Sequence, residues 1–132
     1  MEKQFINPDG LARPAVYTPV VTARGGRTIY ISGQVSQDAD GALVGKGDLV
    51  AQTEQIYRNL EGALAGAGAT FNDVVKLNVY VVNFKPEYRD LLQQVRGRYV
   101  SKEHPPASTL IGVQALARPD FLVEIEAVAV VD

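Results

Sequence analysis

The chain has 132 residues, with no cysteine, no tryptophan and one histidine, His104. The absence of cysteine excludes disulfides, thiolate zinc ligands and a cysteine nucleophile, and it is typical of a protein in a reducing compartment. A single imidazole has no second histidine with which to share a metal ion. His104 also falls in a Glu-His-Pro-Pro stretch, which is typical of a loop and not of a catalytic triad. We therefore expect no metal site.

Long apolar runs and an excess of one charge are also lacking. No segment reaches the roughly eighteen consecutive apolar residues of a membrane span, and Met1 to Pro8 contains no signal-peptide core. The formal net charge of −2 provides no bulk attraction to nucleic acid or anionic lipid. Two arginine pairs, Arg24 with Arg27 and Arg96 with Arg98, have no aromatic platform beside them and are interpreted as solvated surface. The sequence predicts a cytoplasmic protein with no nucleic-acid and no membrane partner.

The residues that are present predict one globular domain over residues 1–132. Apolar residues make up 46% of the chain and charged residues 21%, which is the composition of a folded protein. A chain of this length should bury roughly two-thirds of its unfolded surface and needs no covalent staple. No repeat and no linker divides it.

Hydrophobic periodicity predicts an α+β domain of order β-β-α-β-α-β-β, with two helices on one face of a mixed sheet. Gly25 and Gly26 predict a tight hairpin between the first two strands, because glycine adopts positive φ without strain. Asp48 is the expected N-cap of the first helix, and Pro86 the expected start of the second. The expected strands are Val16 to Thr22, Thr28 to Ile31, Asp73 to Val82, Ala107 to Leu116 and Phe121 to Val131, the last two joined by a turn, with a minor strand at Ala42 to Val44.

The last strand is apolar on both faces, which bears on assembly. Alternate residues of a strand point to opposite faces, and two helices can cover only one of them. The second face would then expose a large apolar patch, so we expect the chain to associate with itself there. An alternative stays open, in which the termini or the loop from Val35 to Gly47 cover this face. The residues expected on it are Leu122, Val128 and Val130, whereas Val123, Ile125, Ala127 and Ala129 face the helices.

Two groups of residues are candidates for a site. Glu124 and Glu126 project from the open face, where a carboxylate must be paired, hydrogen-bonded, hydrated or protonated. Solvation, or pairing with a basic residue of a neighbouring strand, explains this pattern equally well. The second group is Ser32-Gly33-Gln34 at the end of a strand, where glycine allows close approach and the polar side chains offer hydrogen bonds. By itself it is also compatible with an ordinary turn.

Several segments in a fixed order give the chain a family resemblance. From about Tyr17 to Val131 it resembles the RidA/YjgF family of reactive intermediate deaminases. The resemblance implies a chorismate-mutase-like fold and a homotrimer with three ligand clefts between subunits. It also implies cofactor-free hydrolysis of imines or enamines, such as 2-aminoacrylate, to the keto acid and ammonia. The segments that carry it are Ile31 to Gln34, Asp40-Gly41, Gln52-Thr53, Asn59-Leu60, Gly66 to Ala69, Asp73 to Lys76, Pro106-Ala107 and Val123 to Ala129.

The same resemblance implies roles for individual residues. Glu124 falls at the position of the glutamate that helps to place a water molecule. The family arginine that grips the substrate carboxylate has no counterpart, because Ser108 stands in its place, and Leu110 replaces the cysteine of some relatives. Losing one partner of a desolvated charge pair costs about 2–5 kcal/mol. We therefore expect weak or altered 2-imino acid deaminase activity, unless another cation reaches the cleft. The expected ligand-binding residues are Tyr17, Ser32, Gly33, Gln34, Ser108 and Thr109, and the candidate cations are Arg24, Arg27, Arg98 and Arg118.

Two function hypotheses remain open at this stage. The first is a hydrolase that adds water to a small imine, enamine or related electrophile, with Glu124 holding the water. Its carboxyl pKa is expected to be raised, since no arginine compensates its charge. The second is a non-catalytic homotrimer that binds a small metabolite or recruits a partner. The ribonuclease activity ascribed to some relatives finds no support here in charge or in a catalytic histidine pair.

Overall fold

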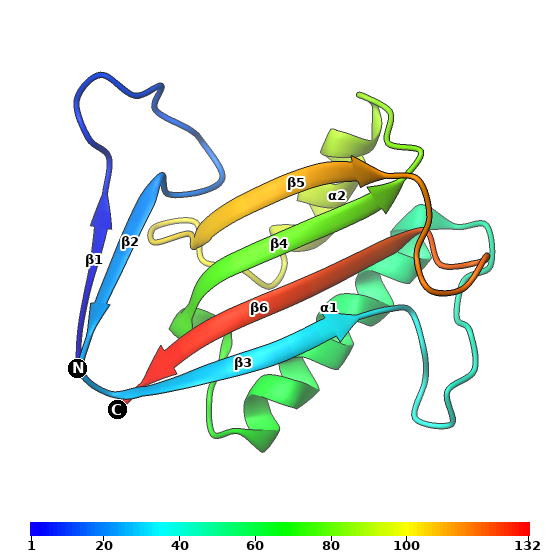
Figure 1. The fold of residues 1–132 in the computed structure, drawn as a ribbon, viewed down its shortest axis with the longest axis horizontal. Helices are drawn as coiled ribbons and strands as arrows, with labels where there is room; N and C mark the ends of the chain where they lie inside the picture. The colour runs from blue at the N-terminus through cyan, green and yellow to red at the C-terminus, as the bar shows by residue number, and fades with distance from the viewer.

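The computed structural model describes residues 1–132. Two α-helices lie on one face of a four-stranded sheet, and a small two-stranded sheet stands at one end (Figure 1). This is the predicted α+β class. The elements are β1 (Glu2–Ile6), β2 (Val20–Arg24), β3 (Arg27–Gln34), α1 (Leu49–Gly66), the 3₁₀ turn η1 (Phe71–Asp73), β4 (Val74–Val82), α2 (Tyr88–Arg96), β5 (Ala107–Val113) and β6 (Val123–Val131).

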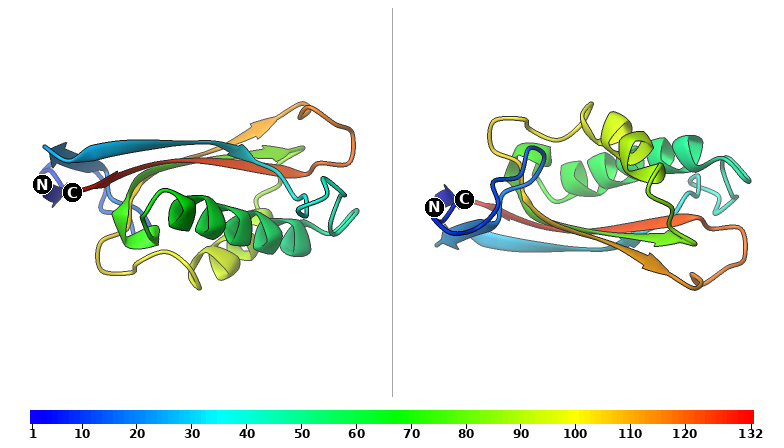
Figure 2. Two further views of the ribbon diagram at one scale, coloured as in Figure 1. Left: turned by 90° about the horizontal axis from the view of Figure 1, so that it is seen from below. Right: turned by 90° about the horizontal axis from the view of Figure 1, so that it is seen from above.

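Both helices arise where the periodicity predicts them. The side chain of Asp48 accepts a hydrogen bond of 3.0 Å from the N–H of Ala51, which satisfies one of the free donors at the start of α1. Ile56, Leu60 and Leu64 recur at four-residue steps and are completely buried against the sheet. Both helices cover the same face of the sheet (Figure 2). Neither of them is long and apolar enough to cross a membrane.

The four-stranded sheet has the order β3-β6-β4-β5. β4 and β5 are parallel, because α2 carries the chain back to the start of the sheet, whereas β6 is antiparallel to both β3 and β4. The predicted mixed sheet is therefore confirmed. The strands expected to be joined by a turn, β5 and β6, are not neighbours, since β5 takes the edge beside the strand to which its crossover helix connects it.

The first predicted hairpin is wrong. Gly25 and Gly26 do have positive φ, 74° and 75°, but β2 pairs with β1, and β3 pairs with β6. β2 also begins at Val20 and not at Val16, because the preceding Pro19 has no N–H to donate to a ladder. The glycine turn thus carries the chain from the small sheet into the large one. The expected minor strand at Ala42 to Val44 is reduced to one bridge, between Gln37 and Leu43.

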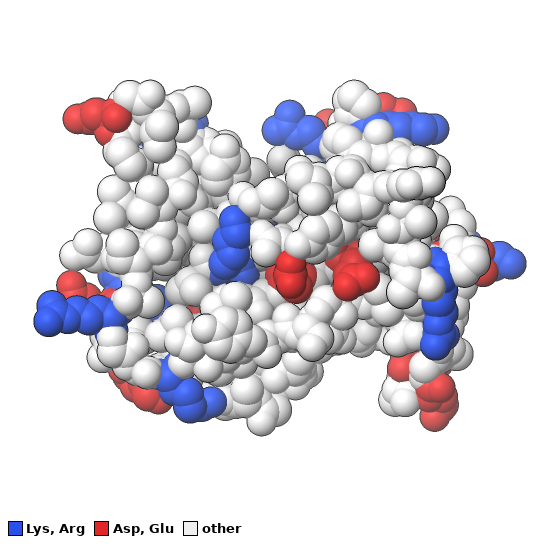
Figure 3. Space-filling view, viewed as in Figure 1, with Lys and Arg blue, Asp and Glu red and all other residues white.

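The sheet face opposite the helices, called the helix-free face below, is left open. No helix lies over it (Figure 2), and Tyr30 of β3 is 81% exposed there. The loop proposed as a cover packs on α1 instead, since Asn59 Nδ2 donates to the carbonyl oxygens of Val35 and Gln37 at 3.2 and 3.0 Å. Acidic side chains with a basic group beside them stand in the middle of this face (Figure 3). The β6 residues with side chains on this face are, as predicted, Glu124, Glu126, Val128 and Val130, with Leu122 just before the strand, while Val123, Ile125, Ala127 and Ala129 belong to the core.

Candidate functional site

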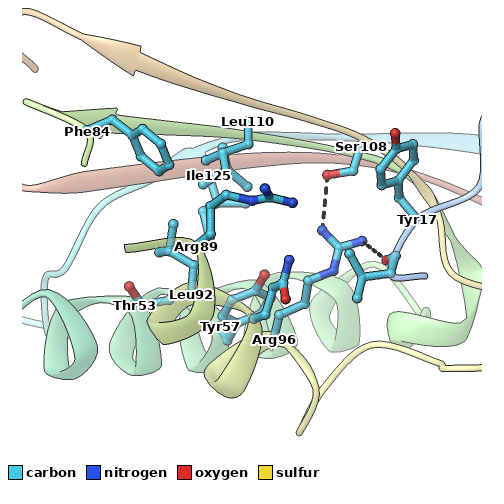
Figure 4. A pocket seen from close by; sticks show the side chains of 13 residues that line it. Tyr17, Thr53, Tyr57, Phe84, Arg89, Leu92, Arg96, Ser108, Leu110 and Ile125 are labelled. Carbon is cyan, nitrogen blue, oxygen red and sulfur yellow. Dashed lines mark hydrogen bonds between the residues drawn. The ribbon is translucent and has the colours of Figure 1, made fainter. Parts of the chain in front are cut away.

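A cavity of about 330 Å³ opens between α2, the edge strand β5 and the segment that precedes β2. Its wall is mostly hydrophobic, with a few polar side chains directed inward (Figure 4). Two of the predicted ligand-binding residues, Tyr17 and Ser108, lie in this wall. A concave apolar pocket with a few convergent polar groups is typical of a small-molecule site.

Arg96 supplies the positive charge that sequence reasoning found missing. Its Nη1 donates to Ser108 Oγ at 3.0 Å, and its Nη2 donates to the carbonyl oxygen of Val16 at 3.0 Å (Figure 4). None of the four ion pairs in the chain involves Arg96. Ser108 therefore orients a guanidinium that comes from α2.

Burial changes the electrostatics around this guanidinium. It lowers the pKa of Arg96 from its ordinary value, against a small opposing effect of Tyr57. Burial also raises the pKa of Tyr57 to about 12, although the charge of Arg96 opposes the rise. An arginine stays protonated in proteins, so the cavity holds a poorly solvated positive charge without a carboxylate partner. Such a site favours an anionic ligand.

This arrangement corrects the interpretation of Arg96 as solvated surface. The cations that the sequence analysis considered instead are engaged elsewhere or are simply exposed, and none lines the cavity. Arg24 is exposed, Arg27 donates to the carbonyl oxygen of Ala67 at 2.9 Å, Arg98 pairs with Glu54 at 3.1 Å, and Arg118 stacks over Phe121 at 5.8 Å.

The signal that could have revealed Arg96 is a polar stripe on α2. Arg89, Gln93 and Arg96 follow one another at steps of four and three residues, so they share one side of the helix. That side adjoins buried Leu92 and Val95, and all three polar residues line the cavity. The sequence shows the stripe, but a polar stripe usually faces water, and only the position of β5 makes this one face a wall.

Glu124 lies on the helix-free face, in contact with Gly33 of β3. A Cβ added to Gly33 would come within 1.9 Å of Glu124 Oε2, so glycine is needed for this close approach. The neighbouring Glu126 is already engaged by β4, because Tyr80 donates its hydroxyl to it and Asn78 Nδ2 donates at 3.3 Å. Glu124 has no hydrogen-bonding partner in the chain and is the carboxylate that remains available.

The pKa of the Glu124 carboxyl is raised, first by partial burial and then by the charge of Glu126. The direction agrees with the sequence-based expectation, but the cause is not the missing arginine. A carboxyl whose pKa moves toward neutrality is better able to accept and return a proton.

An extra residue in β3 shapes the backbone beside Glu124. Ile31 pairs with Ala127, and the next pair is Gln34 with Ile125, so Ser32 and Gly33 stand where a regular ladder has one residue. This is a β-bulge, which bends a strand and releases backbone groups from pairing. Gln34 Nε2 donates to the carbonyl oxygen of Ser32 at 3.1 Å. The bulge brings Gly33 against Glu124, whereas Gln34 pairs with Ile125, whose side chain belongs to the core on the opposite face.

The predicted site residues therefore fall into two groups on opposite sides of the sheet. Tyr17 and Ser108 lie with Arg96 on the helix side, whereas Glu124 meets Gly33 on the helix-free face, and Gln34 lies in register with core-facing Ile125. Thr109 does not join Ser108, because successive residues of β5 point to opposite faces. Its Oγ1 instead accepts a hydrogen bond of 2.9 Å from Lys76 Nζ. No cluster of three or more histidine, aspartate and glutamate side chains is placed to hold a metal ion.

Comparison with known proteins identifies the family of this chain. The family model described as Endoribonuclease L-PSP matches residues 10–131. The crystal structure of YyfB from Yersinia pestis, described as a protein of unknown function of the conserved Rid family, has a TM-score of 0.91 and 43% identity and covers 99% of this chain and 100% of that one. The 3-aminoacrylate deaminase RutC of Acinetobacter baylyi is 32% identical over 98% of both chains. A 2-iminobutanoate/2-iminopropanoate deaminase of Dermatophagoides farinae is 28% identical over 81% of this chain and 80% of its own. The chain therefore belongs to the RidA/YjgF family, which the L-PSP model describes.

Proposed function

We propose that this protein hydrolyses the C=N bond of small carboxylate-bearing imines, or of enamines that tautomerise to them, in a cleft shared by two subunits. One observation carries the proposal: the guanidinium of Arg96 is fixed by Ser108 and Val16 inside an apolar cavity and has no acidic partner. Two relatives support it by name, one as a 3-aminoacrylate deaminase and one as a 2-iminobutanoate/2-iminopropanoate deaminase.

Arg96 would bind the substrate carboxylate in place of the arginine that the family carries on the strand. A guanidinium donates two parallel hydrogen bonds to a carboxylate, and charge-assisted bonds of this kind are about twice as strong as neutral ones. A bound carboxylate would also offset the cost of keeping Arg96 out of water. The change from arginine to serine at position 108 then moves the anion site to α2 and does not remove it.

A second subunit is needed to bring the water-placing carboxylate to this substrate. Within one chain, Glu124 and Arg96 lie on opposite faces of the sheet. The helix-free face that carries Glu124 is also the surface expected to associate with another copy. A symmetric trimer that meets through this face would close the cavity of one subunit with Glu124 of the next.

The reaction needs no electron transfer. Water adds to the carbon of the protonated C=N bond, whose electron pair moves to nitrogen, and the proton of the water passes to Glu124, giving a carbinolamine. Glu124 returns this proton to the amino nitrogen, the C–N bond breaks, the hydroxyl oxygen loses its proton to solvent as it becomes the oxo group, and ammonia leaves. An anion site that fixes the substrate and a carboxylate that orients water contribute through positioning and general base catalysis.

Ammonia release from 2-aminoacrylate or 2-iminobutanoate, generated in the assay by a second enzyme, tests the proposal. Wild-type protein should accelerate release, and Arg96→Met should raise KM by roughly tenfold to a hundredfold, because a charged hydrogen-bonded pair is lost. Glu124→Gln should lower kcat instead. If wild-type protein does not accelerate release from either compound, the deaminase proposal is wrong and the alternative of a non-catalytic binding protein is favoured.

Mixing two impaired variants tests whether the site is shared. If Arg96 and Glu124 act from different subunits, co-expressed Arg96→Met and Glu124→Gln chains should form about a quarter of their sites with both native residues. At a substrate concentration well below KM, the mixture should then be more active than either variant alone. The assembly itself should have a mass of about 43 kDa, three times the 14.3 kDa of the chain. A monomer in solution, or a mixture no more active than either variant, would refute the shared site.

A further inference from the structure

The cavity contains a second guanidinium that hydrolysis of a monocarboxylate does not use. Arg89 lies two helical turns before Arg96 on the same side of α2, and its side chain extends across the cavity toward the place where Arg96 meets Ser108 (Figure 4). It takes part in none of the ion pairs of the chain. It also has no hydrogen-bonding side chain as a partner.

Two like charges that face one small cavity repel each other, and the repulsion grows as water is excluded. Surface arginines usually avoid this by turning outward or by pairing with an acid, as Arg98 does with Glu54 at 3.1 Å. No acidic residue lines the cavity. Arg89 is solvent-exposed and Arg96 is half-buried, and neither has an acidic partner, so an anion that enters the cavity is attracted by both charges.

The rest of the wall indicates the form of such a ligand. The guanidinium of Arg89 points toward that of Arg96, and the apolar side chains of Phe84, Leu110 and Ile125 lie on the other side of Arg89 (Figure 4). Gln93, one turn from each arginine, adds an amide that can donate or accept a hydrogen bond. A small ligand with two carboxylates separated by only a few carbon atoms would match two guanidinium groups that converge in one apolar cavity.

We propose that the preferred substrates are dicarboxylic, with the carboxylate beside the C=N bond held by Arg96 and a second, distal carboxylate held by Arg89. This inference rests on the proposed function and names its substrate class. Arg89 acts here as a specificity residue, because it contacts the end of the substrate that does not react. A distal charge that is bound equally in the ground state and the transition state lowers KM and leaves kcat nearly unchanged.

Two measurements test the distal subsite separately. The first is calorimetric binding of 2-oxoglutarate and of 2-oxobutanoate, which are stable oxo acids with and without the distal carboxylate. The second is hydrolysis of the matching imines, made in the assay by D-aspartate oxidase from D-glutamate and by D-amino-acid oxidase from D-2-aminobutanoate. Wild-type protein should favour the dicarboxylic compound in both measurements by roughly tenfold to a hundredfold, the contribution of one charged hydrogen-bonded pair.

The variants assign that preference to one residue. Arg89→Met should remove the preference, with a loss of affinity for the dicarboxylic compound at least tenfold greater than any loss for the monocarboxylic one, whereas Arg96→Met should weaken the binding of both compounds. Lys85→Met is the matched control, since Lys85 is exposed one turn before Arg89 and lines none of the cavities. It removes the same charge and should change neither binding nor hydrolysis.

The outcomes separate this inference from the proposed function. The distal subsite would be overturned, and the deaminase left intact, by either of two results. One is hydrolysis of both imines with equal kcat/KM; the other is an Arg89→Met variant that loses kcat/KM equally for both imines. Binding of 2-oxoglutarate that depends on Arg89, without hydrolysis of either imine, would support the subsite and overturn the deaminase. Binding of neither oxo acid would overturn the subsite.

Discussion

Replacement of Gly33 by alanine should displace the carboxylate of Glu124 without changing the charge of the site. The added Cβ would lie 1.9 Å from Oε2 and 2.8 Å from Cδ of Glu124, whereas non-bonded heavy atoms rest about 3.5 Å apart. The carboxylate must therefore retreat by about 1.5 Å. Gly33 does not have positive φ, so alanine adds no backbone strain of its own.

The expected effects on stability and on catalysis differ widely. The displaced atoms are the end of a flexible, half-buried side chain, so the free energy of unfolding should change by less than about 1 kcal/mol. A misplacement of about 1 Å in a catalytic group can cost on the order of a hundredfold in rate. We expect kcat of Gly33→Ala to fall by about that factor, with KM nearly unchanged because Arg96 is not disturbed.

Steady-state ammonia release and urea unfolding of the same preparation measure both quantities. Gly62→Ala serves as the control, since a Cβ at that helical position meets nothing within 4 Å. It should keep full activity and be slightly more stable, because alanine favours a helix more than glycine does. Full activity in Gly33→Ala would refute the argument that the position of Glu124 matters.

Three further predictions concern the supports of the site. Ser108→Ala should lower the free energy of unfolding by about 1.5 kcal/mol and raise KM, because Arg96 Nη1 loses its 3.0 Å partner; urea unfolding and kinetics measure this. Glu124→Gln should be more stable than the wild type near neutral pH but not at about pH 4. The folded-state pKa of Glu124 is raised above its ordinary value of 4.5, so the contribution of this group to wild-type stability is complete below that value and is lost as the pH rises through the folded pKa. Urea unfolding of both proteins at both pH values measures this, and the free energies of unfolding of the two proteins should differ by less than about 1 kcal/mol. Gln52→Ala should lower the free energy of unfolding by about 3 kcal/mol and the melting temperature with it, because this buried amide makes hydrogen bonds to Gly45, Asp120 and Leu122.

Each of these predictions has a control or a contrary result. Ser108→Thr keeps the hydroxyl and should retain the KM of the wild type, so an equal defect in both variants would mean that volume matters and not the hydrogen bond. A stability difference for Glu124→Gln that is larger at acid pH than at neutral pH would contradict the raised pKa. Gln55→Ala changes a partly exposed amide on the same helix, and a loss as large as that of Gln52→Ala would show that the buried hydrogen bonds of Gln52 are not the cause, because alanine itself favours a helix.

Local patterns were sufficient to predict the elements that position the site. The four-residue recurrence of Ile56, Leu60 and Leu64 identifies α1, and strict alternation identifies β4 and both faces of β6. Strand partners were less predictable, because a turn signal such as Gly25-Gly26 indicates a reversal of the chain but not the strand beside which it continues.

The site was predictable only in part, for a related reason. The family resemblance pointed to Ser108 and Glu124 as candidates, but the expected absence of an arginine at position 108 did not show which other cation lies beside that position. Arg96 is distant from Ser108 in the motif, and the two meet only because α2 crosses beside the start of β5. Arg96 comes close to Ser108 because α2 packs against the sheet, whereas the arginines chosen as candidates from the sequence all lie elsewhere.

The bulge in β3 makes chain length a stricter constraint on this segment than the choice of side chains. Loss of one codon from the pair Ser32-Gly33 would remove the bulge and restore a regular ladder, with Gln34 still opposite Ile125. The same event would straighten the strand that now approaches Glu124. During evolution this short stretch can exchange one polar residue for another, but it has little tolerance for an in-frame deletion.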